Sequence, residues 1–168
     1  LSYVPGLYED ATVAGIRAVL ERVGASGASI GVVRVGTTVA TNALLERRGA
    51  RTALVTNAGL GDALRIGTQE RPYLFHRRIE LPEPLYECVI ECPARMSVDG
   101  TELEPLDEAE LGYALNAARA AGCQNVAIVF MHGWQHPQHE TRAALVARSA
   151  GFEAVATSHE ISPTQGYV

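Results

Sequence analysis

The sequence lacks the features that mark membrane, secreted or nucleic-acid-binding proteins. No apolar run approaches the roughly 20 residues that a membrane-spanning helix needs, and no basic segment followed by an apolar stretch opens the chain. The 14 lysines and arginines are scattered, apart from short clusters such as Arg77 and Arg78, and the net charge is -5. These absences argue against a nucleic-acid or membrane partner.

Cysteine is also scarce, with only Cys88, Cys92 and Cys123, and no CxxC spacing is present. If residues 85–92 form a strand, Cys88 and Cys92 share one face but lie about 13 Å apart along it. That separation is too long for a disulfide. The sequence therefore predicts reduced thiols and a cytoplasmic location.

What is present is an alternation of strand and helix patterns over 168 residues, 47% of them apolar. This length can bury one substantial core, so we expect a single α/β domain over 1–168, with a layered mixed sheet flanked by helices. Strands are expected at 28–35, 51–57, 85–92 (antiparallel), 125–132 and 152–158, and helices at 10–23, 37–49, 105–122 and 136–151.

The stretch GTTVATN, residues 36–42, follows the predicted strand 28–35 and opens the predicted helix that ends at Gly49. Ligands of open α/β sheets bind at this end of a strand, where hydroxyls, an amide and a helix N-terminus suit a phosphate or a carboxamide. The alternative is that Thr37 or Thr38 only caps the helix. The P-loop lysine is missing, which excludes that motif.

The segment HGWQHPQHE, residues 132–140, holds three of the five histidines and a glutamate. His132, His136 and His139 look like metal ligands, but Pro137 starts a helix between them and the imidazoles need not converge. We therefore expect no metal here, and favour loop anchoring or hydrogen bonding in an active site over a metal-dependent hydrolase.

A third polar segment, IGTQERPYLF, carries Gly67, Gln69 and Arg71. Its arginine could grip a carboxylate or phosphate with two parallel hydrogen bonds, although a surface salt bridge is an equal alternative. No nucleophile is paired with a base along the chain. The first residues begin without an initiator Met, so we expect a piece of a longer protein with an incomplete active site.

Four segments in the same order resemble the hydantoinase A and oxoprolinase family of ATP-dependent cyclic-amide hydrolases. They are GTTVATNALLERRGART, LVTNAGLGDALRIGTQERPYLF, PEPLYE and MHGWQHPQHE, and the second and third lean towards the oxoprolinase branch. The resemblance spans nearly the whole chain and implies most of the family's N-terminal domain, which is of the actin-like ATPase type.

The resemblance implies a parent protein that phosphorylates a ring amide with ATP, after which water opens the ring of 5-oxoproline or a hydantoin. ATP with Mg²⁺ would serve the full-length parent, without tight binding to this chain alone, and a hydantoinase B-type subunit or domain would be the partner. The family's first phosphate-binding segment, DxGGTxTD, would precede Leu1. The substrate- or phosphate-binding positions carried over are Gly36, Thr37, Thr38, Thr41, Asn42, Gly67, Gln69, Arg71, His132, His139 and Glu140.

The chain departs from the family pattern at four positions. Many relatives have His or Met at Val35, Phe at Leu60, Asp at His76, and Asn or Asp at His136. The last two replacements remove a carboxylate or an amide and so bear on substrate identity. The departures at His76 and Val35 motivate a second hypothesis, a non-catalytic domain that mediates subunit or partner interaction.

Overall fold

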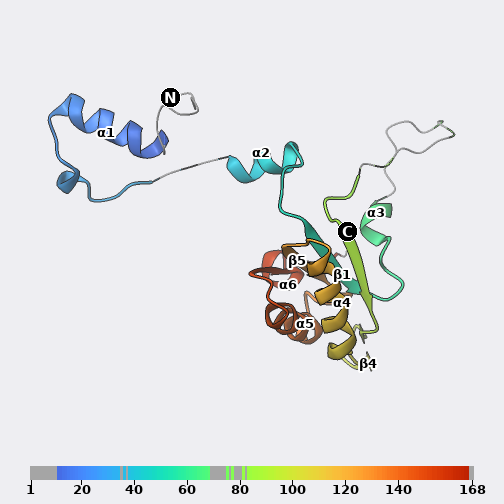
Figure 1. Ribbon diagram of the computed structural model, residues 1–168. Coiled ribbons are helices and arrows are strands. Elements are labelled where there is room, and N and C mark those ends of the chain that lie inside the picture. Colours follow the sequence, from blue (N-terminus) through green and yellow to red (C-terminus); the bar gives the residue numbers. More distant parts are fainter. Residues whose placement is uncertain are drawn as a thin grey trace. The chain divides into compact units, whose positions relative to one another are not determined.

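The computed structural model of the chain describes residues 11–34, 36, 38–68, 75, 77, 81 and 83–166. It divides into two compact units, residues 1–46 and residues 47–168, and each has its own secondary structure (Figure 1). Whether the units act together as the single domain expected from the sequence stays a prediction. None of the described helices has the length and apolarity needed to cross a membrane.

The first unit contains helix α1 (Ala11–Val23), a short 3-10 turn η1 (Gly27–Ser29) and helix α2 (Val39–Leu45). The strand predicted over 28–35 is wrong for the residues described there. Val32 is 74% exposed, and no described strand pairs with residues 30–34. A β-branched run forms a strand only where a neighbouring strand supplies hydrogen bonds, and this run has no strand partner within the described residues.

Helix α2 also ends earlier than the sequence predicts. Its last residue is Leu45, and Arg47 adopts a left-handed conformation with a φ of 53°. The helical path is therefore broken before Gly49, the expected stop.

The second unit is built on a four-stranded sheet of order β2-β1-β5-β6, in which every neighbouring pair runs parallel. Central strand β1 is buried along most of its length, which explains its almost continuous apolar sequence. The α/β class predicted from the sequence is confirmed. The strands are β1 (Thr52–Asn57), β2 (Cys88–Cys92), β5 (Asn125–Val129) and β6 (Ala154–Thr157).

The antiparallel strand predicted over 85–92 is wrong in direction, because β2 lies parallel to β1 with Ile90 opposite Val55. Ile90 is buried and Glu91 exposed, but alternating burial reports which face is covered, and both directions produce it. Antiparallel pairing occurs instead between β3 (Arg95–Met96) and β4 (Glu102–Glu104), on either side of the expected turn at 99–100.

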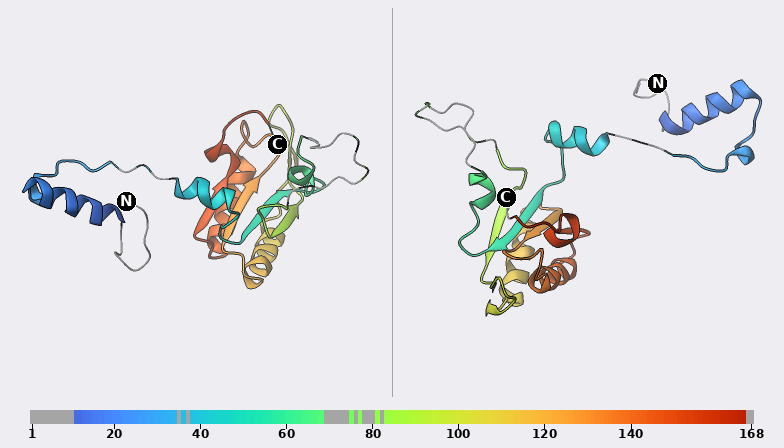
Figure 2. Two further views of the ribbon diagram at one scale, coloured as in Figure 1. Left: turned by 90° about the horizontal axis from the view of Figure 1, so that it is seen from above. Right: turned by 180° about the vertical axis from the view of Figure 1, so that it is seen from behind.

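Helices α4 (Glu108–Ala120) and α5 (Gln138–Ser149) pack against each other and against the sheet (Figures 1 and 2). The predicted cap of α4 is confirmed, since Asp107 Oδ1 accepts hydrogen bonds from the backbone N–H groups of Ala109 and Glu110. Gly122, at a φ of 100°, ends the helix as expected.

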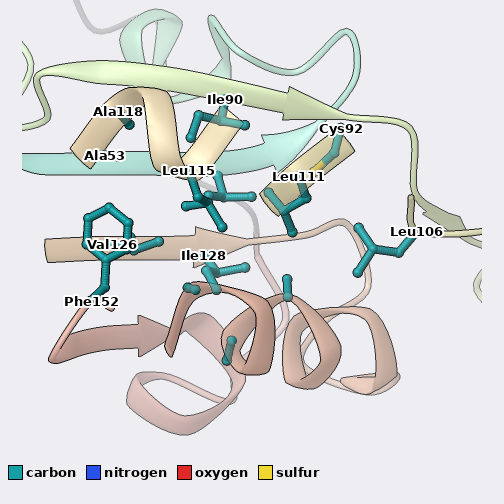
Figure 3. Close-up of a cluster of buried hydrophobic side chains, with 14 of the residues drawn as sticks. Ala53, Ile90, Cys92, Leu106, Leu111, Leu115, Ala118, Val126, Ile128 and Phe152 are labelled. Atoms are coloured by element: carbon teal, nitrogen blue, oxygen red, sulfur yellow. The ribbon is translucent and has the colours of Figure 1, made fainter. Parts of the chain in front are cut away.

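The core of this unit lies between the sheet and the two helices (Figure 3). Its side chains come from the sheet and from both helices, so the three elements stabilise one another. The larger members include Val55, Ile90, Leu106, Leu111, Leu115, Val126, Ile128, Phe130 and Phe152. Two short helices, α3 (Ala63–Ile66) and α6 (Ser158–Ile161), follow β1 and β6.

Candidate functional site

The strand order reverses direction between β1 and β5. The chain leaves β1 for β2 on one side and later returns to β5 on the other. In open parallel sheets this reversal is where ligands bind. The residues that follow β1, β5 and β6 are therefore the first place to look for a site.

Asn57, the last residue of β1, forms hydrogen bonds to the segments that follow β2 and β5. Its Oδ1 accepts a hydrogen bond from the Met131 backbone N–H at 2.6 Å, and its amide donates to the Ala94 carbonyl. The side chain is 1% exposed, so both bonds form away from water. Asn57 therefore fixes the start of the β5–α5 loop. Asn57 was not among the residues predicted from the sequence, although an amide at the end of an apolar strand is a detectable signal.

A cavity of about 540 Å³ lies beside this junction, between the loop after β5 and the segment from α6 onward. His132 is the predicted site residue that lines it, and this residue adopts a left-handed conformation with a φ of 62°. The other lining side chains that can bind a ligand are hydroxyls, an amide and aromatic rings: Phe130, Trp134, Ser158, Ser162, Thr164 and Gln165.

Most of these lining residues were missed from the sequence. Trp134 is the only tryptophan of the chain, and it stands inside the histidine motif. Ser162, Thr164 and Gln165 form a polar cluster soon after the last strand. Both signals were available, but only the sheet order shows that the two segments face one cavity.

Glu140, a predicted binding residue, lies behind the cavity wall with 0% exposure. Its Oε1 accepts hydrogen bonds from Phe130 N–H at 2.9 Å and from the Ser158 hydroxyl at 2.6 Å. Its Oε2 accepts from the backbone N–H of His159 at 3.1 Å and faces the ring Nδ1 of His159 at 2.7 Å. Because a carboxylate only accepts, Nδ1 of His159 carries a proton.

These four bonds join the loop after β5 to the start of α6, which are the two sides of the cavity. Glu140 therefore shapes the cavity by holding its walls. Gly133 belongs to this arrangement, because a Cβ at that position would clash with Glu140 Oε1. A larger residue at 133 would push the carboxylate away from its donors.

His139 and His136 point to other partners. The buried ring of His139 places Nε2 2.6 Å from Glu102 Oε1 and contacts the Phe130 ring edge-on, while its Nδ1 has no hydrogen-bond partner among the described residues. His136 Nε2 lies 3.1 Å from the Val98 carbonyl. No group of three potential metal ligands comes together in the part of the chain that the structure describes.

Of the other predicted positions, Gly67 does not line this cavity, and Thr38 and Asn42 belong to the first unit. Thr38 occupies the N-cap position of α2, but its hydroxyl makes no capping bond, and its carbonyl accepts from Asn42 N–H at 2.8 Å. Gly36 and Thr41 belong to the same unit. Gly67 ends α3 with a φ of 56° and a ψ of -147°, a conformation that favours glycine. Outside the described residues lie Val35, Thr37, Gln69, Arg71 and His76.

Comparison with known proteins assigns the chain to a family. A model of the hydantoinase/oxoprolinase N-terminal region matches residues 3–151. The chain belongs to this family. The resemblance predicted from the four sequence segments is thereby confirmed, including its assignment to the N-terminal region.

Curated relatives in the hydantoinase/oxoprolinase family are far longer than this chain. The 5-oxoprolinase PfmaA of Pestalotiopsis fici is 36% identical over 100% of this chain and 16% of its own length. The 5-oxoprolinase of Saccharomyces cerevisiae is 32% identical over 97% of this chain and 16% of its own. The caprolactamase alpha subunit of Pseudomonas jessenii is 35% identical over 76% and 19%. The chain thus spans about a sixth of the first two relatives.

Two solved structures have the same fold. The ATP-dependent caprolactamase of Pseudomonas jessenii is 28% identical, with a TM-score of 0.77 over 98% of this chain and 25% of its own. A nucleotide-free acetone carboxylase is 22% identical, with a TM-score of 0.62 over 75% and 20%. The second likeness concerns the fold alone.

Proposed function

We propose that the protein carrying this chain is an ATP-dependent hydrolase that opens a cyclic amide ring, and that the cavity beside β5 and β6 holds the ring. The main observation in support of a ring-binding site is the cavity itself. Its volume of about 540 Å³ falls within the range of small-molecule sites. Family membership and relatives named 5-oxoprolinase and ATP-dependent caprolactamase support the choice of reaction.

The lining suits a ring amide. The flat face of such a ring packs well on an aromatic side chain, which Trp134 supplies. Its carbonyl and N–H need one donor and one acceptor, and hydroxyls such as Ser162 and Thr164 can serve as either. These stacking and hydrogen-bond contacts would orient the cyclic amide in the cavity.

ATP, bound with Mg²⁺ by the full-length protein, would supply the phosphoryl group that activates the amide carbon; water would add to that carbon, the ring C–N bond would break and phosphate would be released. The contribution of this chain is to hold the ring in one orientation, which lowers the entropic part of the barrier. Binding of substrate or phosphate by the positions outside the cavity stays a prediction from the family resemblance; they are Gly36, Thr37, Thr38, Thr41, Asn42, Gly67, Gln69 and Arg71. A hydantoinase B-type subunit or domain and a cytoplasmic location complete the proposal.

The test uses the full-length protein with its B part, and measures ATP hydrolysis with 5-oxoproline, hydantoin and caprolactam added separately. We expect one ring to stimulate hydrolysis. Trp134→Ala should raise the KM for that ring about tenfold, the equivalent of losing ~1.4 kcal/mol of ring stacking, with the KM for ATP unchanged.

Tyr113→Ala is the matched control, because this aromatic side chain is 81% exposed on α4 and does not line the cavity. It should leave both KM values unchanged. A rise in the KM for ATP with Trp134→Ala would place the nucleotide in the cavity and overturn the assignment. Stimulation by none of the rings, from folded protein that binds ATP, would favour the non-catalytic partner-binding role.

A further inference from the structure

The side chains of two of the three cysteines are in contact at the amino ends of the strands, opposite the cavity. Cys88 is the first residue of β2, and Cys123 lies in the turn just before β5. Their sulfur atoms are 3.8 Å apart, although the residues are separated by 35 positions in the chain. Because the strands are parallel, all their amino ends lie at one end of the sheet, and the cavity lies at the carboxyl ends.

We propose that Cys88 and Cys123 form a dithiol site that a peroxide oxidises to an intramolecular disulfide. The sulfurs are already in van der Waals contact, so closing to the roughly 2.05 Å of an S–S bond needs a movement of under 2 Å, within reach of small side-chain rotations. The proposal rests on this contact and is independent of the proposed function.

The two thiols differ in access, which sets the order of the chemistry. Cys88 is half-buried, whereas Cys123 is 3% exposed. The Cys88 thiolate attacks one peroxide oxygen, the O–O bond breaks and water leaves, giving a sulfenic acid. The Cys123 sulfur then attacks the Cys88 sulfur, the S–O bond breaks and a second water departs. Two thiols lose two electrons in total, and one peroxide is reduced.

The surroundings of the pair set its dependence on pH. Burial, the contact with Cys123 and the nearby Glu87 raise the pKa of Cys88 to about 11, and the Arg51 guanidinium opposes the rise. The Arg51 and Glu87 side chains are themselves joined at 2.9 Å. Only a small fraction of Cys88 is thiolate at pH 7. Cross-linking should therefore accelerate about 100-fold from pH 7 to pH 9, since the thiolate fraction grows tenfold per pH unit below the pKa.

Cys92 provides an internal control. It is buried, and its sulfur faces the Thr56 carbonyl at 3.4 Å rather than another thiol. Cys92→Ser should leave the cross-link intact, whereas Cys88→Ser should abolish it. Because Cys88 is the more accessible of the pair, its serine variant should remain folded, which circular dichroism checks.

The test treats folded full-length protein with hydrogen peroxide at pH 7 and pH 9, blocks the remaining thiols and digests with a protease that cleaves after glutamate. Cleavage at Glu87 and Glu91 puts Cys88 and Cys92 on separate peptides. We expect peptide 88–91 joined to peptide 111–140, with a mass two hydrogens below the sum of the reduced peptides. The proposal is overturned if no such species forms at pH 9, or if Cys88 accumulates as sulfinic acid while Cys123 stays a thiol.

Discussion

Replacing Glu140 should destabilise the second unit by an amount that depends on which of its hydrogen bonds survive. The carboxylate is 0% exposed and accepts from four donors, two at each oxygen. Glu140→Ala leaves all four donors without an acceptor. A buried donor without an acceptor costs about 1–3 kcal/mol, and two of the four donors are backbone N–H groups that cannot turn away, so we expect a loss of ~4 kcal/mol in the free energy of unfolding.

Glu140→Gln should cost less, for a reason that the geometry makes specific. The amide oxygen of glutamine can replace one carboxylate oxygen, but its NH₂ group then faces the two donors that bonded to the second carboxylate oxygen. The Ser158 hydroxyl can rotate to accept, and the ring of His159 can change tautomer. In either orientation one backbone N–H, of Phe130 or of His159, faces another donor. One orphaned buried N–H costs about 1–3 kcal/mol, so we expect ~2 kcal/mol.

Urea denaturation followed by circular dichroism measures both variants, with the slope m used to confirm that the extent of unfolding is unchanged. Glu153→Ala is the matched control, because this glutamate is exposed and lies just before β6 of the same unit. It should change stability by less than about 0.5 kcal/mol. Equal losses for Gln and Ala, or a loss below about 1 kcal/mol for Ala, would refute the hydrogen-bond argument.

Two further predictions follow from the fold. Asp107→Ala should lower the free energy of unfolding by ~1 kcal/mol, because two N–H groups at the start of α4 lose their acceptor. Asp107→Asn should retain most of this stability. A urea midpoint that is unchanged in the alanine variant would contradict the prediction. Burial first, then Glu110 and Glu91, raises the pKa of Cys92 to about 12. A thiol with a raised pKa contributes stability that is fully present below its ordinary value near 9 and is lost as the pH rises towards 12. Stability should thus fall by up to ~1.4 kcal/mol per pH unit across that window, and Cys92→Ala, measured by urea denaturation at several pH values, should flatten the slope.

The sequence by itself determined the elements whose local signals agree with their burial. The cap at Asp107 and the stop at Gly122 fixed α4, and the apolar runs at 52–57 and 125–129 fixed two central strands. The family resemblance also came from the sequence, because it depends on ordered motifs and needs no coordinates.

Tertiary structure decided what depends on partners distant in sequence. The sequence could not decide the direction of β2, because alternating apolar residues indicate only that one face of a strand is buried. Residues 30–34 have a β-branched sequence but no strand partner among the described residues. The contact between Cys88 and Cys123, the burial of Glu140 and the grouping of Trp134 with Ser162 each join segments that local patterns cannot relate. Local propensity reports what a segment can form, whereas burial and hydrogen-bond partners are properties of the assembled sheet and helices.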